Sequence, residues 1–411
     1  MSAMSVHMRL ASLAAMATLV ASPLAAQDRL LGLRAAGAGV TAEGIWLGGN
    51  GVLQPSLLGG DSLRITRMTQ LSVPITAVTP LGGTWTLDAT TVYGTGSVTA
   101  EGARDARRTT STISGLSDVR LRATGRLFDE ALLLTAGANL PTGRTELDAE
   151  QLTALRALAA PAFALMAPPV GQGPSGTLGV LLAREAGGWA LAGGVAYEIR
   201  GQFAPVAALV AGAPSIDFRP GNVIHASLGA DRLLGRHRVS AAFSADVYAQ
   251  DRLRAGSVAD ASQDAITLAE VKLGPVFTTD LQLQLAAPRL RELVLWGTNR
   301  WRAPFSRDGV RIDGSSGNYL DGGLRASLPV TRRTDLFTAI DGRWHTGLDL
   351  DDALTTAGVA GGALTLGVSQ TLGHVTVQPF VRGQAGQLRF TRADGASYTG
   401  GAAGLTILTR F

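Results

Sequence analysis

The chain of 411 residues contains no cysteine, only 5% aromatic residues and only 17% charged residues. Without cysteine an exported protein has no disulfides, so hydrogen bonding and packing must stabilise it. Long apolar runs are also missing: the longest, Ala157 to Val170, is interrupted by Pro161, Pro168 and Pro169. A run of about 20 residues is needed to span a bilayer as a helix, so the sequence argues against a helical membrane protein.

Linkers, blocks of like charge and shifts in composition are absent after the N-terminus. A soluble chain of this length predicts two or more domains. The 52 glycines lie among many short alternating segments, which favours one large domain of repeated strands.

The N-terminus resembles a secretory signal peptide. Arg9 precedes an apolar run from Leu10 to Ala21, and small residues follow up to Ala26. We predict that residues 1–26 are removed and that the mature chain begins near Gln27. The alternative, a first transmembrane helix, requires a longer run than the one present.

Ser114 to Gly143 reads as two strands joined by a tight turn, and its first strand alternates most regularly. One face carries Val119, Leu121, Ala123, Gly125 and Leu127, and the other carries Asp118, Arg120, Arg122, Thr124 and Arg126. A soluble sandwich turns its apolar face inward, whereas a membrane barrel turns it toward lipid and lines a wet lumen with the charged face. Several segments run past the ~5–6 residues typical of soluble strands, so we predict the membrane barrel.

Tight turns and longer connections alternate along the chain, as short periplasmic turns and long extracellular loops require. Tight turns are predicted near 81–83, 129–130, 186–188, 234–236, 288–289, 332–333 and 372–373. Longer connections are predicted around 101–111, 142–174, 204–221, 253–263, 305–317, 348–357 and 392–396.

The fold class predicted is all-β: a single transmembrane antiparallel β-barrel of about 14–16 strands, within a range of 12–16, over residues 63–411. Residues 27–62 form either a first strand, around Arg34 to Trp46, or a plug in the lumen. If this segment is a strand, the barrel has about sixteen strands; if it is a plug, the barrel has about fourteen. We favour the plug. The final segment ends in Phe411, which resembles the assembly signal of outer-membrane barrels and predicts the barrel-assembly machinery as a partner.

Charged residues on the inward faces are candidates for the lumen wall. They are Arg120, Arg122, Arg126, Arg300, Arg302, Arg343 and Arg382, with Asp88, Asp118, Asp246 and Asp341 as opposing charges. They could select solutes by charge. The alternative, which we prefer, is that they form ion pairs with one another along a solvent-exposed wall and select nothing.

The connection from Thr145 to Val170 predicts an amphipathic helix. Leu147, Gln151, Leu155 and Leu158 fall at helical spacing, and Pro161 ends the run. We expect this loop to fold into the barrel mouth, where Leu155, Leu158, Phe163, Leu165 and Met166 line an apolar entrance. A lid that packs against other loops is an equal alternative.

Catalytic signals are poor. We expect His225 and His345 in strands and His237 and His374 in tight turns, and none of the four lies in a recognisable catalytic motif. We therefore predict that the protein is not an enzyme. The alternative is a catalytic pair in which the fold brings a serine near His345. We predict no metal, no cofactor and no nucleic-acid partner, because no corresponding spacing appears.

The hairpin carries motifs that resemble a known family. The motif residues are Gly115, Leu116, Asp118 and Val119, followed by Leu140, Pro141, Thr142 and Gly143. They resemble the outer-membrane family of the meta-cleavage pathway of phenol degradation, in which a glycine usually stands where this chain has Ser117. The segments Gly171 to Leu178 and Trp189 to Tyr197 are similar too.

The resemblance implies a barrel distantly related to fatty-acid and hydrocarbon channels. We therefore expect a bacterial outer-membrane channel for passive uptake of small hydrophobic or aromatic solutes, surrounded by outer-membrane lipid. The alternative is a non-conducting barrel with a structural or surface-binding role.

Overall fold

The computed structural model describes residues 35–48, 52–54, 63–102, 107–128, 131–159, 165, 170–206, 216–255, 266–347, 358–389 and 395–410. No helix in this part of the chain is long and apolar enough to cross a membrane. The predicted signal peptide, Phe163, Met166 and Phe411 lie outside the described residues.

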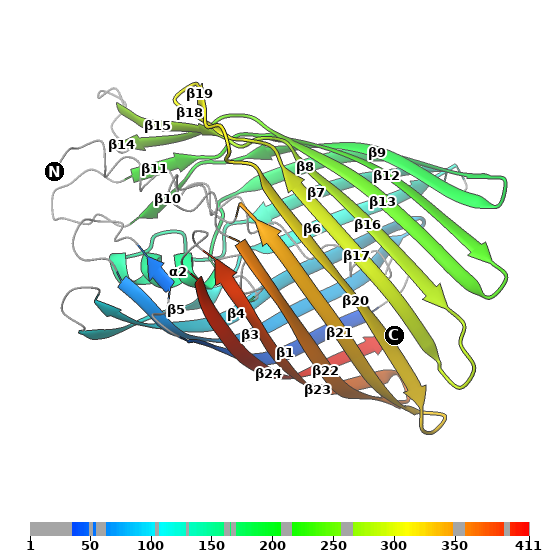
Figure 1. Cartoon of the computed structure of the whole chain (residues 1–411). Helices are drawn as coiled ribbons and strands as arrows, with labels where there is room; N and C mark the ends of the chain where they lie inside the picture. The colour runs from blue at the N-terminus through cyan, green and yellow to red at the C-terminus, as the bar shows by residue number, and fades with distance from the viewer. Residues whose placement is uncertain are drawn as a thin grey trace.

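The chain forms a closed antiparallel barrel of 16 strands, with β5 and β6 counted as one interrupted strand (Figure 1). Around the wall these are β1 (Ala35–Leu47), β3 (Leu63–Gly82), β4 (Trp85–Gly102), β5 (Arg108–Leu116), β6 (Val119–Leu127), β7 (Leu132–Leu140), β8 (Ser175–Ala186), β9 (Trp189–Arg200), β12 (Val223–Leu234), β13 (His237–Tyr248), β16 (Val276–Leu285), β17 (Glu292–Arg302), β20 (Gly317–Pro329), β21 (Thr334–Thr346), β22 (Gly358–Leu372), β23 (Val375–Arg389) and β24 (Gly395–Arg410).

β1 closes the barrel, so the preferred expectation of a lumen plug in about fourteen strands is wrong over Ala35–Leu47. β1 pairs along its length with β24, from Ala35 opposite Arg410 to Leu47 opposite Tyr398, and with β3 on its other edge. Small residues such as Gly37, Gly39 and Gly44 weaken the periodic signal here, because they offer no side chain to either face. The sixteen-strand alternative is the observed one.

Six of the predicted tight turns join neighbouring strands at one end of the barrel, and the seventh, at 129–130, lies outside the described residues between β6 and β7. Gly235 and Gly373 have φ of 63° in two of these turns, a region that favours glycine. The loop predicted at 101–111 is too long, because β4 continues to Gly102 and β5 begins at Arg108. Polar β-branched residues of β5 resemble a loop by composition but pair regularly with β4.

The outer face of the wall is apolar. Leu178, Leu228, Ile340 and Trp344 alternate with inward residues along their strands and are 59–70% exposed on the outside. Leaving so many large apolar side chains in water is unfavourable, whereas hydrocarbon accepts them. The barrel therefore spans a membrane with its apolar face toward lipid, as the alternation in β6 predicts.

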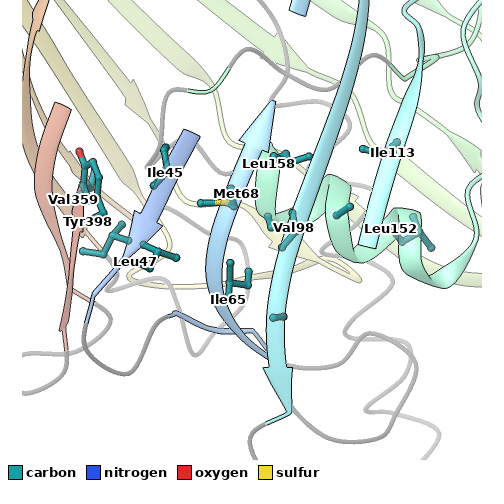
Figure 2. Close-up of a cluster of buried hydrophobic side chains, with 14 of the residues drawn as sticks. Ile45, Leu47, Ile65, Met68, Val98, Ile113, Leu152, Leu158, Val359 and Tyr398 are labelled. Atoms are coloured by element: carbon teal, nitrogen blue, oxygen red, sulfur yellow. The ribbon is translucent and has the colours of Figure 1, made fainter. Parts of the chain in front are cut away.

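The connection between β7 and β8 turns inward and carries the helix α2 (Ala149–Leu158). The helix packs against β3, β4 and β5. Leu152 and Leu158 meet Met68, Val98 and Ile113 in one buried cluster (Figure 2). The helix thus lies inside the barrel mouth against one wall, as the amphipathic pattern predicts.

Three other connections build a second sheet that sequence analysis missed. Its six strands are β10 (Phe203–Val206), β11 (Ile216–Arg219), β14 (Asp251–Ala255), β15 (Ile266–Lys272), β18 (Ser306–Arg307) and β19 (Val310–Arg311). Figure 1 shows this sheet and α2 at the same end of the barrel, away from the tight turns. The short β2 (Val52–Gln54) pairs with β3. We call the second sheet the loop sheet.

Candidate functional site

Asp118 holds the α2 loop to the barrel wall. Its Oδ1 accepts a hydrogen bond of 2.9 Å from the N–H of Gly143, and its Oδ2 accepts bonds of 2.7 Å from the N–H of Gln172 and from Nδ2 of Asn139. The carboxylate therefore ties both ends of the loop to the β5–β6 break. The sequence predicts Asp118 as a lumen residue, but it is 5% exposed and both oxygens serve this clamp.

The neighbours of Asp118 have structural roles in the same clamp. The Thr142 Oγ1 accepts a 3.0 Å bond from the N–H of Val119, and the Ser117 Oγ accepts a 2.9 Å bond from the N–H of Val92. Pro141 follows directly after Leu140, the last residue of β7, as expected for a residue that cannot donate to the ladder. Ser117 thereby joins the broken strand to β4.

Two glycines allow the ends of the loop to meet. A Cβ atom on Gly143 would lie 2.8 Å from the Gly171 nitrogen, and a Cβ atom on Gly171 would lie 2.7 Å from the Gly143 oxygen. Both contacts are with backbone, which cannot move aside. The N–H of Gly171 also donates a 2.7 Å bond to the Arg144 carbonyl. The loop between β7 and β8 is therefore closed at its base, where the backbone near Gly143 contacts the backbone of Gly171.

α2 begins with a complete capping box. The Asp148 side chain accepts a 2.8 Å bond from the N–H of Gln151, and the Gln151 side chain accepts a 3.2 Å bond from the N–H of Asp148. Asp148 is thus the N-cap of α2. The helical spacing did not mark Leu152 and Ala154, which are 1% and 0% exposed.

The predicted apolar entrance is only partly in place among the described residues. Leu158 is 0% exposed and packs into the wall, where its Cδ1 lies against Gly96 and would clash with a Cβ atom at that position. It therefore cannot line an entrance. Leu155 and Leu165 are partly buried beside the cluster and keep some exposure.

The inward face of the wall carries ion pairs. The Arg122 Nε lies 2.8 Å from Asp88 Oδ2 across β4 and β6, and the Arg382 Nη2 lies 2.7 Å from Asp341 Oδ2. The side chains of Arg122 and Arg382 are each 27% exposed although they point inward. The lumen beside them is therefore reached by solvent, as the lumen assignment of Asp88, Arg122 and Arg382 requires.

Other predicted lumen residues are placed differently. Arg120 donates from Nη2 to Oε1 of Gln172 at 3.2 Å and so belongs to the loop clamp, while Arg126 lies half-buried near the tight-turn end of β6. Arg302 is 1% exposed and donates to the carbonyls of Ser315 and Gly347, so it supports loops and does not line the lumen. Arg300 lies over the Tyr319 ring on the wall opposite α2.

Two inward-facing histidines bind carboxylates, which the sequence alone did not reveal. The His225 Nδ1 lies 2.7 Å from Asp246 Oδ1, and its Nε2 lies 3.5 Å from Glu198 Oε2. The His345 Nε2 lies 3.0 Å from both oxygens of Asp321. The partners come from neighbouring strands, so the register had to be known to find them. The predicted lumen residue Asp246 faces the lumen, with its side chain 28% exposed.

Of the other two histidines, His374 lies in the tight turn between β22 and β23, whereas His237 is the first residue of β13, directly after a tight turn. The Nδ1 of His237 accepts a bond from the N–H of Ala286. Within the described ranges no group of three or more His, Asp or Glu side chains is placed to hold a metal ion.

No protein-family model and no curated protein matches the sequence. Solved structures that resemble it include Pseudomonas putida OprB at low pH, with 11% identity over 94% of this chain and 95% of that chain and a TM-score of 0.42. An outer membrane channel from Pseudomonas putida F1 shows 12% identity, coverage of 92% and 96%, and a TM-score of 0.37. OmpT, an outer membrane protein of Vibrio cholerae, in its loop L8 deletion mutant, shows 10% identity, coverage of 90% and 98%, and a TM-score of 0.39.

At these values the likeness says nothing about what this chain binds or transports. The barrel assignment rests on the chain's own strand pairing, which returns from β24 to β1.

Proposed function

We propose that this barrel is a passive channel for small solutes. The observation that carries the proposal is the solvent exposure of inward charged side chains on separate parts of the wall: 27% for Arg122 on β6, 28% for Asp246 on β13 and 27% for Arg382 on β23. A sealed interior would bury these groups or pay a large desolvation cost. A wet interior wider than its own side chains can fill permits diffusion.

The route runs past α2. The helix lies against β3, β4 and β5, and β17 lies half-way round the barrel from β4. A solute would therefore pass between α2 and the wall that carries Asp246, Asp280 and Arg300. Among the described residues α2 narrows the mouth on the side of β3, β4 and β5, which supports a route beside the helix.

The solute class that fits is a small aromatic compound carrying a polar or charged group. Leu155 and Leu165 offer apolar surface at the entrance, and the wall beyond offers carboxylates and guanidinium groups. A purely apolar solute would find no continuous apolar track along the described wall, whose inward residues include paired charges from β4 to β23.

We also propose that the chain is a divergent member of the phenol meta-pathway outer-membrane family. In this proposal residues 1–26 are removed and the mature protein resides in the bacterial outer membrane. Support comes from the clamp, in which Asp118, Val119, Thr142 and Gly143 of the motif meet in one hydrogen-bonded unit. In this proposal the protein has no catalytic role.

Liposome swelling tests the proposal. Liposomes containing the folded protein should swell in isotonic benzoate and phenol faster than liposomes without protein, and a disaccharide should enter more slowly. Equal swelling rates with and without protein for every solute would favour the rival role, a non-conducting structural or surface-binding barrel.

A further inference from the structure

The loop sheet has two unlike faces. Phe218, Leu253 and Val271 are at most 4% exposed and pack with Phe305 in one apolar cluster. Ile216 packs against this cluster and also against the cluster that holds α2. The apolar face of the loop sheet is therefore turned toward the barrel mouth, and its other face is turned to the exterior.

The exterior face is rich in positive charge. It carries the cations Arg219, Arg252, Arg254 and Lys272 and the anions Asp217 and Glu270. Arg219 lies directly opposite Arg252 in the β11–β14 register, an arrangement of like charges that disfavours strand pairing unless an anion intervenes.

Two of the four cations on this face have a carboxylate directly opposite them: Asp217 faces Arg254 in the β11–β14 register, and Glu270 faces Arg252 in the β14–β15 register. The Arg252 Nε lies 3.2 Å from Glu270 Oε1. Within the described ranges Arg219 and Lys272 are exposed and form no ion pair. The Nε atom of Arg254 is buried there without a hydrogen-bond partner. The face thus holds donors that its own carboxylates do not satisfy.

This face continues the lipid-facing surface. Ile224 and Val247, near the loop ends of β12 and β13, are 48% and 44% exposed on the outside. Arg219 lies five residues before Ile224, which places it within about 17 Å along the chain at about 3.3 Å per residue. Cations this close to the end of the lipid-facing surface can reach the headgroup layer of the surrounding leaflet.

We propose that the exterior face of the loop sheet binds the phosphate groups of a phosphorylated lipid headgroup in the leaflet around the barrel mouth. Arg219, Arg252 and Lys272 are the cations that contact phosphate, with Arg254 beside them. The inference rests on the membrane location proposed above and is independent of conduction.

Binding of phosphorylated lipopolysaccharide to the purified full-length protein in detergent tests this site. The variant changes Arg219→Gln, Arg252→Gln and Lys272→Gln together, and the matched control changes Arg236→Gln, Arg332→Gln and Arg333→Gln in tight turns at the other end. A basic residue near an anionic surface contributes roughly five-fold in affinity, so the triple variant should bind about 100-fold more weakly. The control should bind like the parent, and lipopolysaccharide stripped of phosphate should bind the parent as weakly as the variant does.

Equal affinity of parent and triple variant would overturn the site, as would equal binding of stripped lipopolysaccharide. Full displacement of the lipid by millimolar inorganic phosphate would show a site for free anions and would also overturn it. Arg219→Gln alone removes an exposed side chain with no described partner, so it should fold and lose roughly five-fold. Conductance should be unchanged in every variant, which separates failure of this site from failure of the channel.

Discussion

Asp118 and Gln172 are 54 residues apart in the chain, and the N–H of Gln172 donates a 2.7 Å hydrogen bond to Oδ2 of Asp118. With Gly143 and Asn139 as further donors, one carboxylate fixes the stem of the loop that carries α2. These motif residues thus hold the stem of the loop that places α2 against the barrel wall.

Replacing Asp118 should release the loop. Asp118→Ala removes three hydrogen bonds to a charged acceptor, and we expect the stem to lose about 4 kcal/mol. Trypsin should then cut after Arg144 or Arg156 much faster in the folded protein. Asp231→Ala is the matched control, because Asp231 binds Arg238 and Ser240 beside a tight turn at the other end. Identical cleavage rates for parent and Asp118→Ala would show that the clamp does not hold the loop.

The contact between Gly96 and Leu158 should be measurable as a coupling. Gly96→Ala places a Cβ atom against Leu158 and should weaken docking of α2 by about 2 kcal/mol through overpacking. Leu158→Ala should weaken it by about 3 kcal/mol through the cavity left behind. The double variant should weaken docking of α2 by clearly less than the sum of the two single changes, because the new methyl group fills part of that cavity. Hydrogen exchange of the α2 amides gives the values, and simple additivity would mean that the two residues do not touch.

Stability of the loop sheet should fall as pH rises through about 6. Burial raises the pKa of Asp251 from 3.8 to about 6, although the N–H of Gly221 and nearby Arg200 oppose the shift. Because the folded pKa is above the unfolded one, the stabilisation is complete below pH 4 and is lost by about pH 7. The loss is about 3 kcal/mol.

Asp251→Asn should remove this dependence and protect the β11 and β14 amides better at pH 8. Hydrogen exchange of the β11 and β14 amides, compared between variant and parent at each pH, measures this change in protection. Asp217→Asn on the exterior face is the control. An Asp251→Asn difference that is the same at pH 4 and pH 8 would contradict the account.

Single charges in the lumen should set ion selectivity. Arg382→Gln leaves the carboxylate of Asp341 unpaired in the lumen and should shift the permeability ratio roughly twofold toward cations. Asp341→Asn should shift it toward anions, and Arg236→Gln in a tight turn should change it little. Zero-current potentials under a salt gradient report the ratio. Shifts of the same sign for the two lumen variants would show that these groups do not face the conducting path.

The sequence predicted the features that depend on residues close together in the chain. Alternation in β6 gave the lipid and lumen faces correctly, because each strand repeats that choice every two residues. The glycine turns such as 234–236 and the helix capped by Asp148 were recognised for the same reason. β1 was assigned less well, since its glycines carry no facial signal.

Contacts that depend on register or on distant segments could not be read from the sequence. The pairing of His225 with Asp246 needs the β12–β13 register, and the clamp at Asp118 joins three separate segments. The loop sheet escaped notice because its strands have two to seven residues each and lie in three different connections. Arg302 was placed in the lumen because alternation gives direction but not burial.

Planar-bilayer conductance of the parent and of a variant lacking residues 145–170 tests the central claim, a conducting lumen narrowed by α2. The ends of the deletion already meet, since the Gly171 N–H lies 2.7 Å from the Arg144 oxygen, so the barrel should still close. We predict steady conductance for the parent and a clearly larger conductance for the variant. Absence of conductance in both proteins, each shown to be folded by a heat-dependent shift on a gel, would contradict the account.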